Sequence, residues 1–221
     1  MVQLPLMEHM AGQTVPFAHV RKRLWDELVI AHDSWEQYVT LFAHSDERVR
    51  MLNACAGWFF ATTQRTLLRE VILSISRLTD PIKSGSCDNL VIASLLSDSA
   101  IDSHDGLRDA MQAAVDAAVS KAASVRVHRN KYVAHLDHAT ALGTGDQPLP
   151  GLRREDISEA IDLLEKAYNL HGLRVHQSQA FFDVGSMGSV PALLKILESS
   201  ERWTKWRELH DEKGKAVPPA P

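Results

Sequence analysis

One short stretch of the chain, residues 121–138, gathers the side chains best suited to phosphate chemistry. It contains four Lys or Arg residues and one Asp, so it carries a formal charge of +3. Because the whole chain carries −4, the remaining residues carry −7. Three of the eleven histidines also lie in this stretch. A local basic cluster on an acidic chain is typical of a phosphate-binding site, not of a surface that coats nucleic acid.

The spacing within this stretch brings several of its side chains to one helix face. At about 100° per residue, His128, Tyr132 and His135 fall along one stripe of a helix. Arg129 precedes His135 by six residues and would lie about 120° away around a straight helix. A partner helix or a second copy of the chain would have to close that gap. A structural interpretation competes, because the helix dipole also favours basic side chains near a helix C-terminus.

Helical periodicity predicts the elements that must position this stretch. Apolar residues recur every three or four positions in most of the chain, and no segment alternates as a strand does. Pro81 ends one long helix because proline cannot continue it. The predicted helices cover residues 16–42, 46–79, 89–97, 107–138, 156–181 and 191–209. The expected fold class is therefore all-α, a bundle of five to six helices of which two are long.

The same pattern predicts one domain with loose ends. Residues 17–210 form the predicted helical domain, residues 1–16 a flexible arm, and residues 211–221 a disordered tail. Neither a secretory signal nor a run of 18 apolar residues is present, so we expect a cytoplasmic protein with no membrane partner. Cys55 and Cys87 form no CxxC pair, and we expect both to be reduced and largely buried thiols.

The exact residues of the basic stretch resemble a known family. Arg129-Asn130-x(4)-His135 is similar to the Arg-x(4–6)-His signature of the HEPN superfamily, including the polar residue after the arginine. Residues 129–137, Arg-Asn-Lys-Tyr-Val-Ala-His-Leu-Asp, resemble more specifically the abortive-infection U-type, or AbiU-like, branch. A Ser-Arg-Leu-Thr-Asp stretch at 76–80 and an Asn-Leu pair at 89–90 are also similar. The resemblance covers roughly residues 20–180.

The resemblance implies a helical bundle that dimerises about a two-fold axis and, in many members, a metal-independent endoribonuclease. The active site would form where the motifs of two copies meet. His135 would be the acid/base group, and Asn130 would orient His135 or the phosphate. An imidazole titrates near neutrality and suits this proton transfer. The planar guanidinium of Arg129 would contact non-bridging phosphate oxygens, and the products would be a 2′,3′-cyclic phosphate and a 5′-hydroxyl.

Neighbouring residues receive supporting roles. The candidates for RNA binding are Lys131, Arg126 and His128. The candidates for support of the site are Tyr132, Asp137, Arg77 and Asp80. For Tyr132 and Asp137 a structural role is an equal alternative. Arg77 and Asp80 are interpreted as structural, either in ion pairs between helices or at the helix end before Pro81, and the alternative is that they orient the motif.

Three classes of function remain open at this point. The first is an RNA-cleaving toxin or phage-defence nuclease, and the second is a non-catalytic HEPN module that binds RNA, nucleotide or a partner protein. RNA and a second copy of the chain are the expected partners, and an antitoxin or a nucleotidyltransferase would fit either class. The third class, a metal enzyme, is disfavoured because the two clustered histidines, His135 and His138, fall short of a three-ligand site. No metal and no cofactor are predicted.

Overall fold

The described residues of the chain are mostly helical in a computed structural model. The structure describes residues 16–133, 142, 144, 151–183 and 189–211. Beyond residue 200 it describes the helix backbone and, of the side chains, those of Arg202 and Lys205. The α-helices are α1 (Phe17–Phe42), α2 (Asp46–Thr79), α3 (Leu107–Lys121), α4 (Ala123–His128), α6 (Arg154–His176) and α7 (Ser189–Asp211). The smaller elements are the 3₁₀ turns η1 (Ile92–Ser97) and η2 (Ser99–Ser103), the π-helical turn η3 (Arg129–Val133), and the hairpin strands β1 (Lys83–Ser84) and β2 (Cys87–Asp88). The all-α prediction is confirmed.

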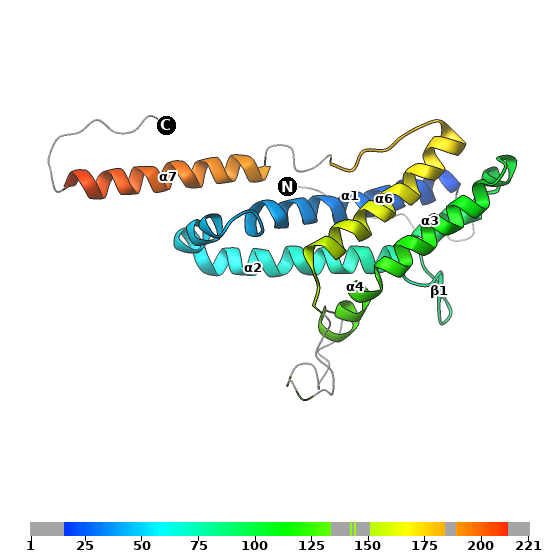
Figure 1. The fold of residues 1–221 in the computed structure, drawn as a ribbon, viewed down its shortest axis with the longest axis horizontal. Helices are drawn as coiled ribbons and strands as arrows, with labels where there is room; N and C mark the ends of the chain where they lie inside the picture. Colours follow the sequence, from blue (N-terminus) through cyan, green and yellow to red (C-terminus); the bar gives the residue numbers. More distant parts are fainter. Residues whose placement is uncertain (1–15, 134–141, 143, 145–150, 184–188, 212–221) are drawn as a thin grey trace.

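The bundle is built from two helix pairs that share one core. Helices α1 and α2 lie side by side, and α6 packs along α3 (Figure 1). Leu28 of α1, Ile75 of α2, Met111 of α3 and Leu164 of α6 are fully buried together. Helix α7 adds a second, smaller cluster, in which its first turns contact the joined ends of α1 and α2. Apolar positions three and four residues apart on each helix supply these buried faces.

Helix α2 ends where the sequence dictates, and it is also interrupted. Ser45 caps its first turn by accepting a hydrogen bond from the Arg48 amide at 3.2 Å. Thr79 is its last residue, as the following Pro81 predicts. The backbone leaves the helical conformation at Ala56, which has φ −160° and ψ 64° and precedes Gly57. None of the helices that the structure describes is long and apolar enough to cross a membrane.

Several sequence predictions need correction. The helix predicted over 107–138 is broken, because α3 ends at Lys121 and a π-helical turn follows α4. The helix predicted over 89–97 is a pair of 3₁₀ turns that extends to Ser103. The prediction of buried thiols is wrong, since Cys55 lies on the solvent face of α2 and Cys87 on an exposed hairpin strand. Most of the predicted arm and tail lies outside the described residues.

A charged hydrogen bond ties α1 to α6. Nδ1 of His32 lies 2.7 Å from Oε1 of Glu165, and both side chains are about one-fifth exposed. The hydrogen bond to Glu165 raises the pKa of His32 above its ordinary value of 6.5, against a smaller opposing effect of burial. The protonated imidazole is therefore the form that holds the two helices together.

We predict that His32 makes the stability of the fold depend on pH. A histidine whose pKa is raised by folding contributes stability that is complete below pH 6.5 and is lost as pH rises through the folded-state pKa. The loss of unfolding free energy on His32→Asn should therefore be larger at pH 5.5 than at pH 9, by urea denaturation. His44→Asn, at an exposed position after α1, is the control. An equal loss at both pH values would contradict the assignment.

Candidate functional site

The end of α2 presents two oxygen acceptors at the edge of the bundle. Pro81 disfavours a helical conformation at the preceding residue, and Asp80 is extended, with φ −65° and ψ 162°. Its carboxylate thereby leaves the helix. The Thr79 hydroxyl donates to the Ile75 carbonyl at 2.7 Å and is buried, so the last turn is fixed from inside. The carbonyl of Thr79 and the carboxylate of Asp80 are the two acceptors.

Two arginines from the basic stretch bind these acceptors. Nη1 of Arg126 donates to the Thr79 carbonyl at 3.0 Å. Nη1 and Nη2 of Arg129 donate to the two carboxylate oxygens of Asp80 at 3.1 and 2.6 Å, a bidentate pair. The arginines are three residues apart, so their side chains reach the same side of α4 and η3. Arg129 is 24% exposed and Asp80 is 18% exposed, which shields the pair from most solvent screening.

Arg77 and Asp80 bind different partners in the structure. Nε of Arg77 donates to Glu27 of α1 at 2.7 Å, and its Nη2 lies 3.0 Å from Glu70. Arg77 thus joins α1 to α2 on an exposed surface. Asp80 instead contacts Arg129, the arginine of the motif.

The π-helical turn η3 carries the rest of the described motif. Asn130 and Lys131 are exposed, His128 is half-buried, and Tyr132 is 49% exposed. The guanidinium of Arg69, on α2, lies 5.9 Å from the centre of the Tyr132 ring, within the range of a cation–π contact. The break after α3 and the wide turn of η3 replace the straight helix assumed from the spacing. His135 and Asp137 lie outside the described residues.

A comparison with known families gives a match over most of the chain. Residues 15–184 match the family model HEPN_AbiU2, described as AbiU2. The chain belongs to the AbiU2 family of HEPN proteins. No curated protein and no solved structure matches the chain. The matched segment contains the bundle from α1 to α6 and the Arg129–Asp80 pair.

The charge of Arg129 is compensated by Asp80, which limits how strongly Arg129 alone attracts an anion. A guanidinium has five N–H donors, and Asp80 occupies one on each of two nitrogens. The Nε–H of Arg129 is buried and finds no acceptor among the described residues. The Asp80 carboxylate compensates the charge of Arg129, so attraction of a polyanion must come from other cations. A hollow of about 260 Å³ beside Arg126 has Asp80 and Asp116 in its wall and is unsuited to phosphate.

Two further groups of residues with possible functional roles were not predicted from the sequence. One is a line of exposed side chains on α2, Trp58, Arg65 and Arg69, that leads to Tyr132. The spacing of seven and four residues, which returns to the same helix face, could have identified it. The other is the group Asp98, His171 and His176, whose side chains are of metal-ligating types and lie together. Its histidines are five residues apart on α6, a spacing that does not place them on one helix face.

We predict that Asp80 and Arg129 are energetically coupled. Asp80→Ala should lower the unfolding free energy by about 1–3 kcal/mol, because a partly buried guanidinium loses its charged acceptor. A double-mutant cycle with Arg129→Ala should give a coupling energy of about 1–2 kcal/mol, measured by urea denaturation. The exposed Lys22–Asp26 pair is the comparison and should give under about 0.5 kcal/mol. A coupling for Asp80 and Arg129 no larger than this would contradict the prediction.

Proposed function

We propose that this HEPN protein is a metal-independent endoribonuclease whose active site is shared by two copies of the chain. The observation that carries the proposal is the bidentate Asp80–Arg129 pair, which holds the arginine of an intact HEPN motif in one orientation. The proposed setting is that of a toxin or phage-defence effector in the cytoplasm. An antitoxin or a nucleotidyltransferase would be its protein partner.

The proposed reaction requires two proton transfers. The RNA 2′-oxygen attacks the adjacent phosphorus and loses its proton, while the bond from phosphorus to the 5′-oxygen breaks and that oxygen gains a proton. One imidazole serves as base and another as acid. His135 supplies one such group per chain, and a two-fold dimer therefore supplies both. The products are a 2′,3′-cyclic phosphate and a 5′-hydroxyl.

Arg129 is proposed to stabilise the phosphate in this reaction. Donors fixed in place before the reaction stabilise developing charge without reorganisation, which is a large contribution to catalysis. Asp80 fixes the guanidinium and leaves the second N–H of Nη1 and of Nη2 unused by the pair. Asn130 follows on the same turn, is exposed, and is proposed to orient His135 or the phosphate.

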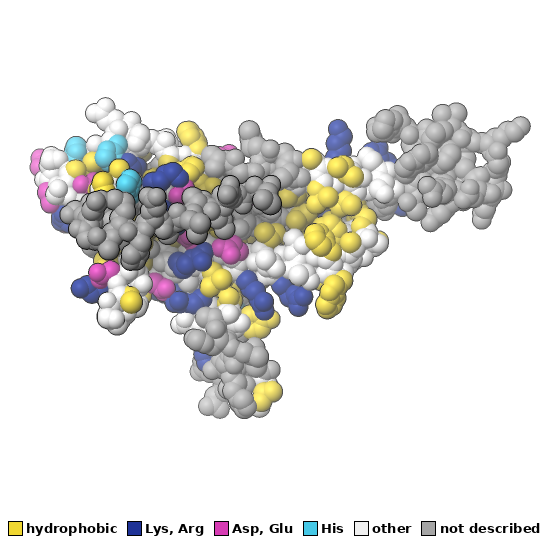
Figure 2. Space-filling model, turned by 180° about the vertical axis from the view of Figure 1, so that it is seen from behind, with side chains coloured by type: hydrophobic (Ala, Val, Ile, Leu, Met, Phe, Trp, Pro, Cys, Tyr) yellow, Lys and Arg dark blue, Asp and Glu magenta, His cyan; other side chains and the backbone are white. Residues whose placement is uncertain are grey.

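The positive charge that attracts RNA is proposed to come from helix α2. Between Glu47 and Glu70 the helix contains four arginines and no acidic residue. Arg65 and Arg69 are exposed there, and each guanidinium lies beside an aromatic ring, that of Trp58 at 5.8 Å and that of Tyr132 at 5.9 Å. Figure 2 shows basic and hydrophobic side chains next to one another along one edge of the molecule. Exposed rings beside cations are typical of surfaces that bind single-stranded nucleic acid.

One observation favours a second candidate, a HEPN module that binds RNA, nucleotide or a partner protein without cleavage. Asp80 compensates the charge of Arg129, as it would in a purely structural pair. The aromatic and basic line on α2 would serve such a module equally well. Cleavage separates the two candidates.

The cleavage experiment uses cellular RNA in EDTA with the parent protein and two variants, His135→Ala and His104→Ala. We expect the parent and His104→Ala to produce 2′,3′-cyclic phosphate ends. His135→Ala should lose at least 100-fold of the rate, because general acid–base catalysis contributes about 10²–10⁴-fold. No cleavage by the parent would favour the binding module. Equal cleavage by all three would place the activity outside the motif.

We predict that Arg65 and Arg69 contribute to RNA affinity through charge. The double variant Arg65→Ala/Arg69→Ala should weaken binding of a single-stranded oligoribonucleotide and reduce the salt slope of log K by about 1.4, or about 0.7 per lost contact. Fluorescence anisotropy between 50 and 200 mM salt measures both quantities. The matched control is Arg23→Ala/Arg153→Ala, which removes two exposed arginines from other helices or their ends. The same slope change in both double variants would exclude a specific RNA surface on α2.

A further inference from the structure

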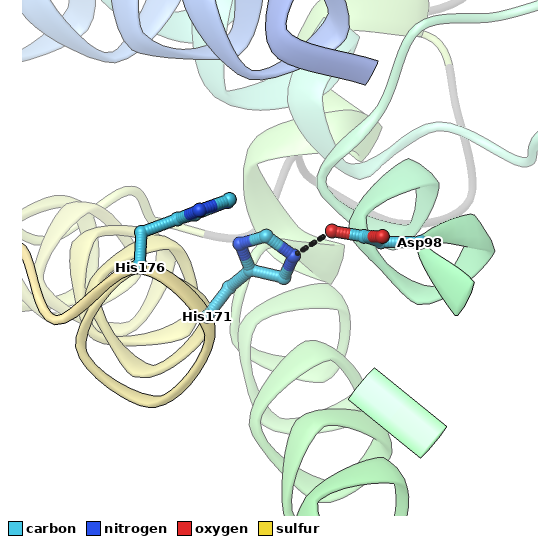
Figure 3. Close-up of side chains that lie close together, drawn as sticks. All are labelled: Asp98, His171 and His176. Atoms are coloured by element: carbon cyan, nitrogen blue, oxygen red, sulfur yellow. Dashed lines mark hydrogen bonds and ion pairs between the residues drawn. The ribbon is translucent and has the colours of Figure 1, made fainter. Parts of the chain in front are cut away.

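Three side chains of metal-ligating types meet at the C-terminal end of α6. Asp98 lies at the junction of η1 and η2, and His171 and His176 lie on the last turns of α6 (Figure 3). One ligand atom from each residue lies within 4.8 Å of the others. The residues come together only in the fold, since Asp98 is 73 positions from His171.

His171 is the fixed member of the group. Its side chain is fully buried, and its Nε2 lies 3.0 Å from Oδ2 of Asp98. Its Nδ1 is also buried and has no hydrogen-bond partner among the described residues, and this nitrogen is on the side of the ring toward His176 (Figure 3). An ion shared with Asp98 would bind Nε2, the nitrogen that faces the carboxylate, in the neutral tautomer that carries its proton on Nδ1.

A hydrogen bond to Oδ1 holds the Asp98 carboxylate in place. Oδ1 accepts a hydrogen bond from the Ala100 amide at 3.0 Å, which caps η2. Oδ2 remains directed at His171. Two ligand atoms of a tetrahedral zinc site, with bonds of about 2.0–2.2 Å, lie about 3.3 Å apart. The observed 3.0 Å between Oδ2 and Nε2 is close to that separation.

His176 is the adjustable member. It is exposed and is the last residue of α6, and its ring centre lies 5.4 Å from that of His171. The turn that follows is anchored, because the Ser178 amide donates to the Gly172 carbonyl at 3.1 Å. A Cβ at Gly172 would lie 2.6 Å from the Ser178 carbonyl, so this close approach requires glycine. The backbone is therefore fixed, and rotation of the His176 side chain can bring its nitrogen into ligand distance.

We propose that Asp98, His171 and His176 bind one divalent transition-metal ion of the zinc type. Two imidazoles and one carboxylate are typical ligands of such ions, whereas Mg²⁺ and Ca²⁺ prefer oxygen. His176 also lines a cavity of about 600 Å³, from which water completes the coordination. Arg21 and Lys22 line the same cavity and oppose a cation, which favours an ion that binds imidazole strongly.

The ion would join the end of α6 to the turns η1 and η2. Binding to the folded state alone raises stability in proportion to the logarithm of the free metal concentration. The proposal does not depend on ribonuclease activity, because none of its ligands belongs to the HEPN motif.

The test uses tag-free protein that has been stripped with EDTA and dialysed. Zinc is titrated by calorimetry at pH 7.5, and Co²⁺ is added to detect the visible absorption of a tetrahedral site. We expect one equivalent of Zn²⁺ to bind, a rise in Tm with added Zn²⁺, and no saturable binding of Mg²⁺ or Ca²⁺.

The decisive variant is His176→Ala, because an exposed residue at a helix end can be removed without unfolding the core. We expect this variant to lose at least 10-fold in zinc affinity and to lose the rise in Tm. His44→Ala, which removes another exposed histidine, should retain both. Asp98→Asn should also weaken binding. Absence of saturable zinc binding to the parent, or equal binding by parent and His176→Ala, would overturn the proposal.

Discussion

The ion pair between Asp80 and Arg129 connects parts of the chain that are 49 residues apart, and the candidate site depends on it. It requires that α2 end at Thr79, since one further turn of helix would carry the carboxylate around the helix axis. Pro81 enforces that end. Arg126 strengthens the same junction by binding the last carbonyl of α2 at 3.0 Å. One proline therefore determines where both arginines of the basic stretch are bound.

This junction also decides how charge is distributed around the motif. An arginine bound by a carboxylate is well oriented, but it contributes little net attraction for a polyanion at long range. The acid-free stretch of α2 from Arg48 to Arg69 carries uncompensated positive charge within the helix itself. Arg69 lies over Tyr132, three residues after Arg129, so this charge reaches the motif. Orientation and attraction are thus supplied by different arginines, and a substrate would need both.

Local sequence signals predicted the long helices because each has a regular apolar face and a clear end. The bounds of α2, from the Ser45 cap to the residue before Asp80, follow from capping and proline alone. The partner of Asp80 did not follow, because a contact across 49 residues depends on how α4 packs after the break at Ala122. The exposure of Cys55 was missed because average burial of a residue type does not specify which helix face it occupies. His171 and His176 were missed for a related reason, since Asp98 joins them only through packing.

The two proposed sites, the HEPN motif and the metal site, lie near opposite ends of helix α6. Its first turn lies beside the end of α3, where Lys121 donates to Asp156 at 3.0 Å, close to the start of α4. Its last two turns carry His171 and His176, 15 and 20 residues beyond Asp156 along the helix. At 1.5 Å per residue, these ends are about 30 Å apart (Figure 1). An ion at Asp98 would therefore not reach a phosphate at Arg129, and any influence between the sites would pass through the rigidity of α6. This separation makes the proposed metal site at one end of the bundle compatible with the proposed metal-independent chemistry at the other.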